Sequence, residues 1–334
     1  MKKFIAILIL IALFCIPFAA FSGCEAQNDG RLKVVVTIFS EYDWVMNVLG
    51  DRADDVNVTL LLDSGADLHS YNPTGSEILK IAKADLFVYV GGESDSWVPA
   101  ALQNAVNKSM RTISLLDVLG DAAKEEEAVN DLEGEDEHDH SHEEEGEDHD
   151  HVHEEAEYDE HVWLSLSNAK LFVNRIAEEL AAIDPEYAET YRTNAATYIS
   201  SISALDERYK AMVADSSRDT IVVADRFPFR YLVDDYDIKY YAAYVGCSAV
   251  SELNMSIVRN LRDHVNALDI RVLLVTENSD KRIAQAVKSE SARKDQEILV
   301  LDALESASQK EYAAGRTYLS VMGSNLEALQ KALR

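Results

Sequence analysis

Short apolar runs rich in β-branched residues alternate with segments of helical spacing from Arg31 to the end of the chain. This alternation is typical of βαβ units, in which helices cover the faces of a parallel sheet. Two sets of runs have the composition of strands: Leu32–Ile38, Val56–Leu62, Asp85–Val90 and Thr112–Leu116 in the first, and Thr220–Ala224, Ile238–Tyr244, Ile270–Val275 and Glu297–Leu301 in the second. The pattern therefore predicts an α/β fold with two lobes, each built on a parallel sheet.

Helical spacing predicts Tyr42–Leu49 and Ser76–Lys83 as helices of the first lobe, and Ser256–Leu268, Asp280–Ser291 and Leu319–Leu333 as helices of the second. Between the lobes, Asp184 and Pro185 form a strong helix start, because Asp accepts backbone N–H bonds and Pro fits the first turn. An apolar stripe then recurs at helical spacing up to Met212, with no Gly or Pro to interrupt it. We expect a rigid helix of about 30 residues and roughly 45 Å, with an N-terminal lobe at 24–183, the linking helix at 184–214 and a C-terminal lobe at 215–334.

Charge is concentrated in one segment of the chain. The 334 residues carry a formal net charge of −29, and residues 121–160 hold 21 acidic residues and one Lys, which leaves −9 for the rest. The net negative charge excludes nucleic acid as a partner, since nucleic-acid binding depends on basic residues. It favours cations as ligands. The segment has no apolar period, so we expect residues 121–160 to form a disordered loop. Two H-x-H-x-H patterns, His138–His142 and His149–His153, lie within it.

The first residues have the features of an export signal. Lys2 and Lys3 precede an apolar run that ends in Ser22-Gly23-Cys24, which predicts a signal peptide at 1–23 and a lipid anchor on Cys24 that tethers the protein outside the cell membrane. Cys15 leaves with the signal, so Cys247 remains without a partner for an intramolecular disulfide. For Cys247, packing as a small residue is favoured over a role as a thiolate ligand.

Two histidines outside the acidic segment share an Asp-x-His pattern. His69 follows Asp67 and His161 follows Asp159, whereas His264 lies on a polar helix and is expected at the surface. A histidine by itself is more often structural than a ligand. The repeated pattern is what makes His69 and His161 candidates for metal binding.

The segment Gly65-Ala-Asp-Leu-His69-Ser-Tyr-Asn-Pro-Thr-Gly-Ser76 resembles the G-A-D-P-H-x-Y-x-P-T-x-S motif of the substrate-binding lipoproteins of zinc and manganese ABC importers, and Asp159-Glu-His161-Val-Trp-Leu resembles their D-P-H-V-W-L. The resemblance extends over the whole mature chain. It implies two Rossmann-like lobes with a metal ion between them, two ligands from each lobe and a helix across the back. His69 and His161 correspond to the first-lobe ligands, and an ABC permease is the implied partner of a monomeric protein.

The second lobe departs from the motif of this family. The position of the third ligand, five residues before Tyr231, falls on Arg226, and a guanidinium cannot coordinate a cation. We expect Asp225 to take its place, unless Asp225 only pairs with Arg226. For the fourth ligand, Glu277 matches a glutamate of the family and is favoured over Asp280.

Two imidazoles with carboxylates suit Zn²⁺ and also Mn²⁺, and both the affinity order and the His-rich loop favour zinc. We expect that loop to collect zinc weakly and to lose it as the pH falls, because carboxylate neighbours favour charged imidazoles. The chain has no H-E-x-x-H or G-x-S-x-G motif, so a hydrolase is disfavoured. A manganese or iron importer component, a surface adhesin or metal buffer, and a siderophore or cobalamin binder remain as alternatives.

Overall fold

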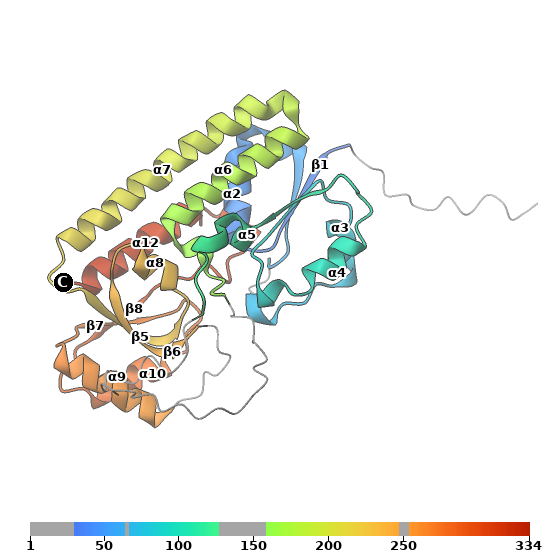
Figure 1. The fold of residues 1–334 in the computed structure, drawn as a ribbon. Helices are drawn as coiled ribbons and strands as arrows, with labels where there is room; N and C mark the ends of the chain where they lie inside the picture. Colours follow the sequence, from blue (N-terminus) through green and yellow to red (C-terminus); the bar gives the residue numbers. More distant parts are fainter. Residues whose placement is uncertain (1–29, 64–66, 127–157, 247–253) are drawn as a thin grey trace, which may run out of the picture. The chain divides into compact units, whose positions relative to one another are not determined.

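A computed structural model describes residues 30–63, 67–126, 158–246 and 254–334 (Figure 1). The chain divides into a short unit, Met1–Leu32, and a large unit, Lys33–Arg334, whose architecture is given below. The predicted signal peptide, Cys24, the two H-x-H-x-H patterns and Cys247 lie outside the described residues. In the described ranges, no helix combines the length and apolar character that a membrane span requires.

Two parallel four-stranded sheets form the framework, which confirms the predicted α/β fold class. The first sheet has the order β2-β1-β3-β4 and the second β6-β5-β7-β8. The strands are β1 (Leu32–Val36), β2 (Val56–Leu60), β3 (Leu86–Tyr89), β4 (Arg111–Ser114), β5 (Thr220–Phe227), β6 (Lys239–Val245), β7 (Val272–Val275) and β8 (Glu297–Val300). Each corresponds to one predicted run. The central strands β1, β3, β5 and β7 are mostly buried, as expected for parallel sheets covered on both faces.

Helices follow most of the strands, as βαβ connections require. Those of the first part of the chain are α2 (Phe39–Leu49), α3 (Gly75–Ile81), α4 (Val98–Gln103), α5 (Leu115–Leu119) and α6 (Leu166–Ile183). The later ones are α7 (Ala188–Ala214), α8 (Arg230–Asp234), α9 (Met255–Ala267), α10 (Arg282–Glu290), α11 (Gln309–Ala313) and α12 (Tyr318–Ala332). The five predicted lobe helices are found as α2, α3, α9, α10 and α12.

The predicted linking helix is present as α7, and it packs along α6 (Figure 1). The sequence analysis assigned no helix to Leu166–Ile183, although one face of α6 is fully buried. Pro185 begins a short 3₁₀ turn that separates the two helices. The boundaries of the lobes at residues 183 and 215 stay predictions, because the unit from Lys33 to Arg334 is undivided.

The helix α7 is hydrogen-bonded to two other helices, α2 and α12. The side-chain amide of Asn194 donates to the carbonyl of Val48 at the end of α2, 3.0 Å away. Two turns further on, Ile202 and Leu205 of the predicted stripe are buried. Near the other end of α7, the hydroxyl of Tyr209 donates to the carbonyl of Met322 in α12 at 2.6 Å. The helix therefore fixes α2 and α12 to one continuous element.

Strand β5 is longer than predicted and carries an irregularity that matters for the site. Its pairing with β6 shifts register between Val223 and Arg226. A β-bulge bends a strand and redirects its side chains. The carboxyl end of β5 thereby presents Asp225 and Arg226 at the same edge as the residues that follow β7 and β8.

Candidate metal site

His69 lies in a short 3₁₀ turn, Leu68–Ser70, that follows β2. The turn begins at Asp67, whose carboxylate Oδ1 accepts the backbone N–H of His69 at 3.0 Å. Asp favours such positions because its short side chain reaches the backbone two residues on. The Asp-x-His spacing is thus a local device that fixes the backbone of His69.

His161 is held in the same way, and more completely. Oδ1 of Asp159 accepts the backbone N–H of His161 at 2.9 Å and lies 3.0 Å from its Nδ1. His161 is 1% exposed. Because Asp159 contacts Nδ1, it is Nε2 that faces the centre of the site.

Glu160 performs the corresponding role for the ring of His69. Its Oε2 lies 3.4 Å from His69 Nδ1 and accepts the hydroxyl of Ser94. Its Oε1 accepts the backbone N–H of Ser94 at 2.8 Å. Ser94 Oγ is itself 2.8 Å from His69 Nδ1. Burial alone would raise the pKa of Glu160, but the hydrogen bonds from His69 and Ser94 hold it below the usual value.

Gly92 gives Glu160 the room that this arrangement needs. Its φ is +78°, a conformation that glycine adopts without strain. A Cβ at this position would overlap the carboxylate of Glu160. The strand-to-loop exit after β3 therefore requires glycine because a buried carboxylate lies against it.

The two histidines lie next to a third residue, Glu305, which the sequence patterns do not predict as a ligand. Within the described part of the chain, His69, His161 and Glu305 form one group whose potential ligand atoms all lie within 4.8 Å of one another. Glu305 Oε1 is 3.1 Å from His161 Nε2. Burial acts to raise the pKa of Glu305, but its hydrogen bond with His161 and the charge of Arg226 bring it below the usual value. An ionised carboxylate beside two imidazoles is a donor set suited to a divalent transition metal.

Glu277 lies behind this group rather than in it. Its two oxygens accept the backbone N–H groups of Ala303 and Glu305, at 2.9 and 3.2 Å. Burial and the neighbouring Asp302 raise the pKa of Glu277 to about 7. The predicted ligand Glu277 thus holds the loop after β8 that carries Glu305. The only sequence signal for Glu305 was its place after the predicted strand Glu297–Leu301.

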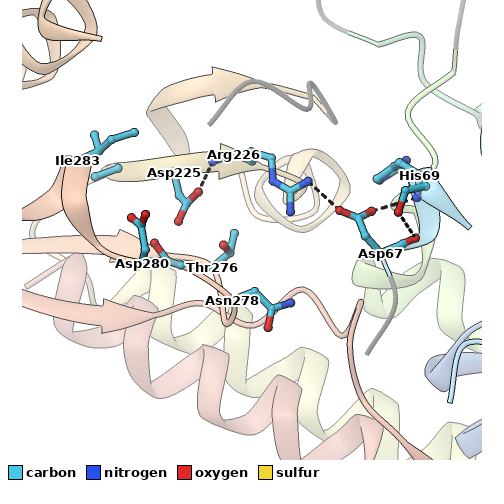
Figure 2. A pocket seen from close by; sticks show the side chains of 11 residues that line it. Asp67, His69, Asp225, Arg226, Thr276, Asn278, Asp280 and Ile283 are labelled. Atoms are coloured by element: carbon cyan, nitrogen blue, oxygen red, sulfur yellow. Dashed lines mark hydrogen bonds and ion pairs between the residues drawn. The ribbon is translucent and has the colours of Figure 1, made fainter. Parts of the chain in front are cut away.

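Asp225 and Asp280 also lie outside the group of three. Asp225 Oδ1 accepts the backbone N–H of Arg226 at 2.9 Å. Asp280 accepts the backbone N–H of Arg282 at 2.9 Å at the start of α10, and its carboxylate pairs with the guanidinium of that residue. Both aspartates line a larger cavity beside the site, together with Asp67 (Figure 2).

Two cavities adjoin each other here. The smaller, of about 10 Å³, is lined by His69, His161, Arg226, Pro228, Gly246, Thr276 and Glu305. Its volume is close to that of one water-sized sphere, so it accommodates a single ion. The larger cavity, of about 360 Å³, shares His69, Arg226 and Thr276 with it. The small cavity contains the three candidate ligand residues, and the large one lies beside it.

Both ends of the predicted disordered loop, residues 121–126 and 158–160, belong to the described part of the fold. Glu125 and Tyr158 form an antiparallel bridge, and the backbone N–H of Asp159 donates to the carbonyl of Lys124 at 2.9 Å. Asp159 and Glu160 are buried. The prediction of disorder was wrong for these residues, because their carboxylates find histidine and backbone partners inside the fold.

Several known proteins are similar to this chain. The zinc-binding lipoprotein AdcA of Streptococcus pneumoniae serotype 4 is 34% identical over 332 residues, which cover 99% of this chain and 61% of that protein. The high-affinity zinc uptake system protein ZnuA of Bacillus subtilis is 29% identical over 336 residues, covering 99% of this chain and 98% of that protein. The chain thus spans about three fifths of the AdcA length.

Solved structures agree with this relationship. The Zn(II)-bound ZnuA-like domain of Streptococcus pneumoniae AdcA superposes with a TM-score of 0.69 at 28% identity, over 91% of this chain and 99% of that domain. The model of the family described as zinc-uptake complex component A, periplasmic, matches residues 34–332. A match over this length, together with the two Asp-x-His segments at one site, places the chain in the zinc-uptake complex component A family.

Proposed function

We propose that this protein captures Zn²⁺ outside the membrane and passes it to an ABC permease. The observation that carries the proposal is the convergence of His69, His161 and Glu305 at one ion-sized cavity. The three come from segments far apart in the sequence. Glu160 and Asp159 hold the two imidazole rings, and Glu277 holds the backbone of Glu305. A site prepared in this way binds a metal with little reorganisation.

The ligand set supports zinc over manganese. Zn²⁺ accepts two imidazoles and one carboxylate in a tetrahedral site that keeps one further position. Mn²⁺ prefers more oxygen donors and binds more weakly to a given donor set. The related AdcA and ZnuA proteins are named for zinc. Manganese import is the alternative, and competition between the two metals decides it.

We further propose that the protein transports and does not catalyse. A zinc hydrolase needs a general base beside a metal-activated water. The carboxylates nearest the two histidines, Asp159 and Glu160, are instead engaged by the imidazole rings. The related AdcA and ZnuA proteins are named for zinc binding and zinc uptake.

Attachment to the membrane and the acidic segment belong to the same proposal. Cys24 is the expected site of lipidation, which would keep the protein near its permease. The H-x-H-x-H patterns lie in the stretch between Glu126 and Tyr158. Because Tyr158 is only three residues before His161 and its backbone is bridged to Glu125, both ends of that stretch are close to the metal site. This placement supports a role in collecting zinc.

Zinc titration of single variants tests the site. We expect His69→Ala, His161→Ala and Glu305→Ala each to lose high-affinity zinc binding in chelator-competition measurements on the purified mature protein. His264→Ala is the matched control, because His264 stacks on Tyr241 in the second lobe at a ring distance of 3.6 Å and lies outside the group of three. Unchanged affinity in all three site variants would refute the assignment, and parent-like manganese binding with weak zinc binding would favour the alternative.

A further inference from the structure

Arg226 reaches into the metal site from the end of β5. It lines both cavities, and it is the one arginine or lysine among the described residues that line the smaller one. The register shift of β5 between Val223 and Arg226 directs it there. Figure 2 shows the guanidinium extended toward Asp67, away from Asp225 and Asp280.

The guanidinium lies between two carboxylates that belong to the site. Its Nη1 is 3.2 Å from Asp67 Oδ2, and its Nη2 is 3.9 Å from Glu305 Oε2. The other oxygen of each carboxylate is already engaged, by the backbone N–H of His69 and by His161 Nε2. Arg226 therefore joins the turn that carries His69 to the carboxylate of Glu305.

We propose that Arg226 is a built-in cation of this site, which competes with the metal ion for Glu305 and sets how tightly zinc is held. The inference rests on the proposed function, because it assumes that zinc binds at His69, His161 and Glu305. Without metal, the guanidinium neutralises Glu305 and Asp67. When zinc binds, a divalent charge arrives beside a charge that cannot be removed by deprotonation, and the two repel each other.

Two structural consequences follow for the bound metal. Glu305 offers zinc one oxygen, Oε1, because Oε2 remains turned to Arg226. Among the described residues, no fourth ligand joins His69, His161 and Glu305, so water would take the fourth coordination position of a tetrahedral ion. A site with three described ligands and a fixed cation releases its ion more readily than a four-ligand site. Ready release suits a protein that passes zinc to a permease.

The direction of the change in zinc affinity on substitution of Arg226 distinguishes this proposal from a purely structural role. We expect Arg226→Gln to tighten zinc binding by roughly ten- to a hundred-fold and to slow zinc dissociation, whereas loss of a supporting residue would weaken binding. Arg226→Lys keeps the charge and should stay close to the parent. Arg262→Gln is the matched control, because Arg262 pairs with Asp263 on the surface of α9 and its loss changes the net charge equally.

Arg226→His tests the coordination directly. X-ray absorption at the zinc edge should detect two imidazoles in the parent and three in this variant, with affinity at least as high as that of Arg226→Gln. Thermal unfolding of the metal-free variants shows whether each is folded. If His69→Ala and Glu305→Ala abolish zinc binding while Arg226→Gln weakens it or leaves it unchanged, the inference about Arg226 is overturned and the proposed site stands. If His69→Ala and Glu305→Ala have no effect, the proposed site itself fails.

Discussion

Asp159 holds His161 at two points, through the backbone N–H at 2.9 Å and through Nδ1 of the ring at 3.0 Å, both on the same carboxylate oxygen. Asp67 makes only the first of these contacts with His69, and its second oxygen faces Arg226. The ring of His69 is supported by Glu160 and Ser94 instead. Two similar sequence motifs thus orient their histidines by different means.

Replacement of Asp159 tests the first arrangement. We expect Asp159→Ala to weaken zinc binding by about 10- to 100-fold, the range typical for loss of a residue that supports a metal-bound histidine. The physical reason is that the ring of His161 loses the acceptor that fixes its orientation. Chelator competition measures the affinity, and Asp263→Ala on the surface of α9 is the control. Parent-like affinity in Asp159→Ala would contradict the supporting role.

Glu160 can be tested at the level of the His69 ring. In Glu160→Gln, the side chain keeps its size but loses the charge that favours a proton on Nδ1. We expect zinc affinity to fall by roughly tenfold and the ¹⁵N shifts of the His69 imidazole to show a mixture of tautomers. Ser94→Ala should change the same shifts. An unaltered imidazole spectrum in both variants would remove Glu160 from this role.

Glu277 is expected to act on Glu305 through the backbone. Glu277 accepts the backbone N–H groups of Ala303 and Glu305. In Glu277→Gln, one of these N–H groups would face the NH₂ of the glutamine amide, so the loop would lose one of its two hydrogen bonds. We expect a loss of zinc affinity of roughly tenfold, smaller than that of Glu305→Ala. X-ray absorption should show the same number of zinc ligands as in the parent. A lost oxygen ligand would instead identify Glu277 as a direct ligand.

The raised pKa of Glu41 predicts how the free energy of unfolding varies with pH. Burial, and then the charge of Asp95, raise the pKa of Glu41 from 4.5 to about 8. Its Oε2 accepts the backbone N–H and the hydroxyl of Thr37 and the backbone N–H of Ile38. The folded protein therefore binds a proton that the unfolded chain has released above pH 4.5. The contribution to stability is complete below that pH and is lost as the pH rises toward 8, by up to about 1.4 kcal/mol per pH unit.

Denaturant unfolding of the metal-free protein between pH 5 and pH 8 measures this dependence. We expect Glu41→Gln to make it less steep, because the neutral amide keeps an acceptor for the Thr37 groups without a proton to lose. Glu277, whose pKa is raised to about 7, still contributes in this range. Glu186→Gln, on the exposed turn before α7, serves as the control. An equally steep loss of stability in Glu41→Gln would assign the effect to other groups.

Deletion of the His-rich stretch distinguishes weak zinc binding by that stretch from tight zinc binding at the site of His69, His161 and Glu305. We expect deletion of residues 131–157 to abolish weak zinc sites in calorimetry and to leave the tight site intact, because the deletion spares the Glu125–Tyr158 bridge and Asp159. A deletion that joins the ends by a short Gly-Ser linker keeps the bridge closed. Loss of tight binding in this variant would place a ligand of the tight site in the stretch.

The repeating patterns of the sequence determined the framework of this protein. Apolar runs gave the strands of both sheets, since burial on two faces demands continuous hydrophobicity. The stripe that ends at Met212 gave α7, because a helix needs one buried face. The same local logic identified His69 and His161, whose Asp-x-His segments fold by contacts within three residues. α6 was missed although its own pattern is amphipathic.

Only the tertiary structure decided how the site is completed. Glu277 and Glu305 both follow strands of the second sheet, β7 and β8. Nothing local distinguishes a carboxylate that contacts His161 from one that accepts two backbone N–H groups behind it. The register shift in β5 directs Arg226 to Glu305, and that shift depends on pairing with β6. Contacts between residues more than a hundred positions apart depend on how loops meet at the ends of the sheets. They therefore carry no periodic signal in the sequence, which is why the histidines could be predicted and their carboxylate partner could not.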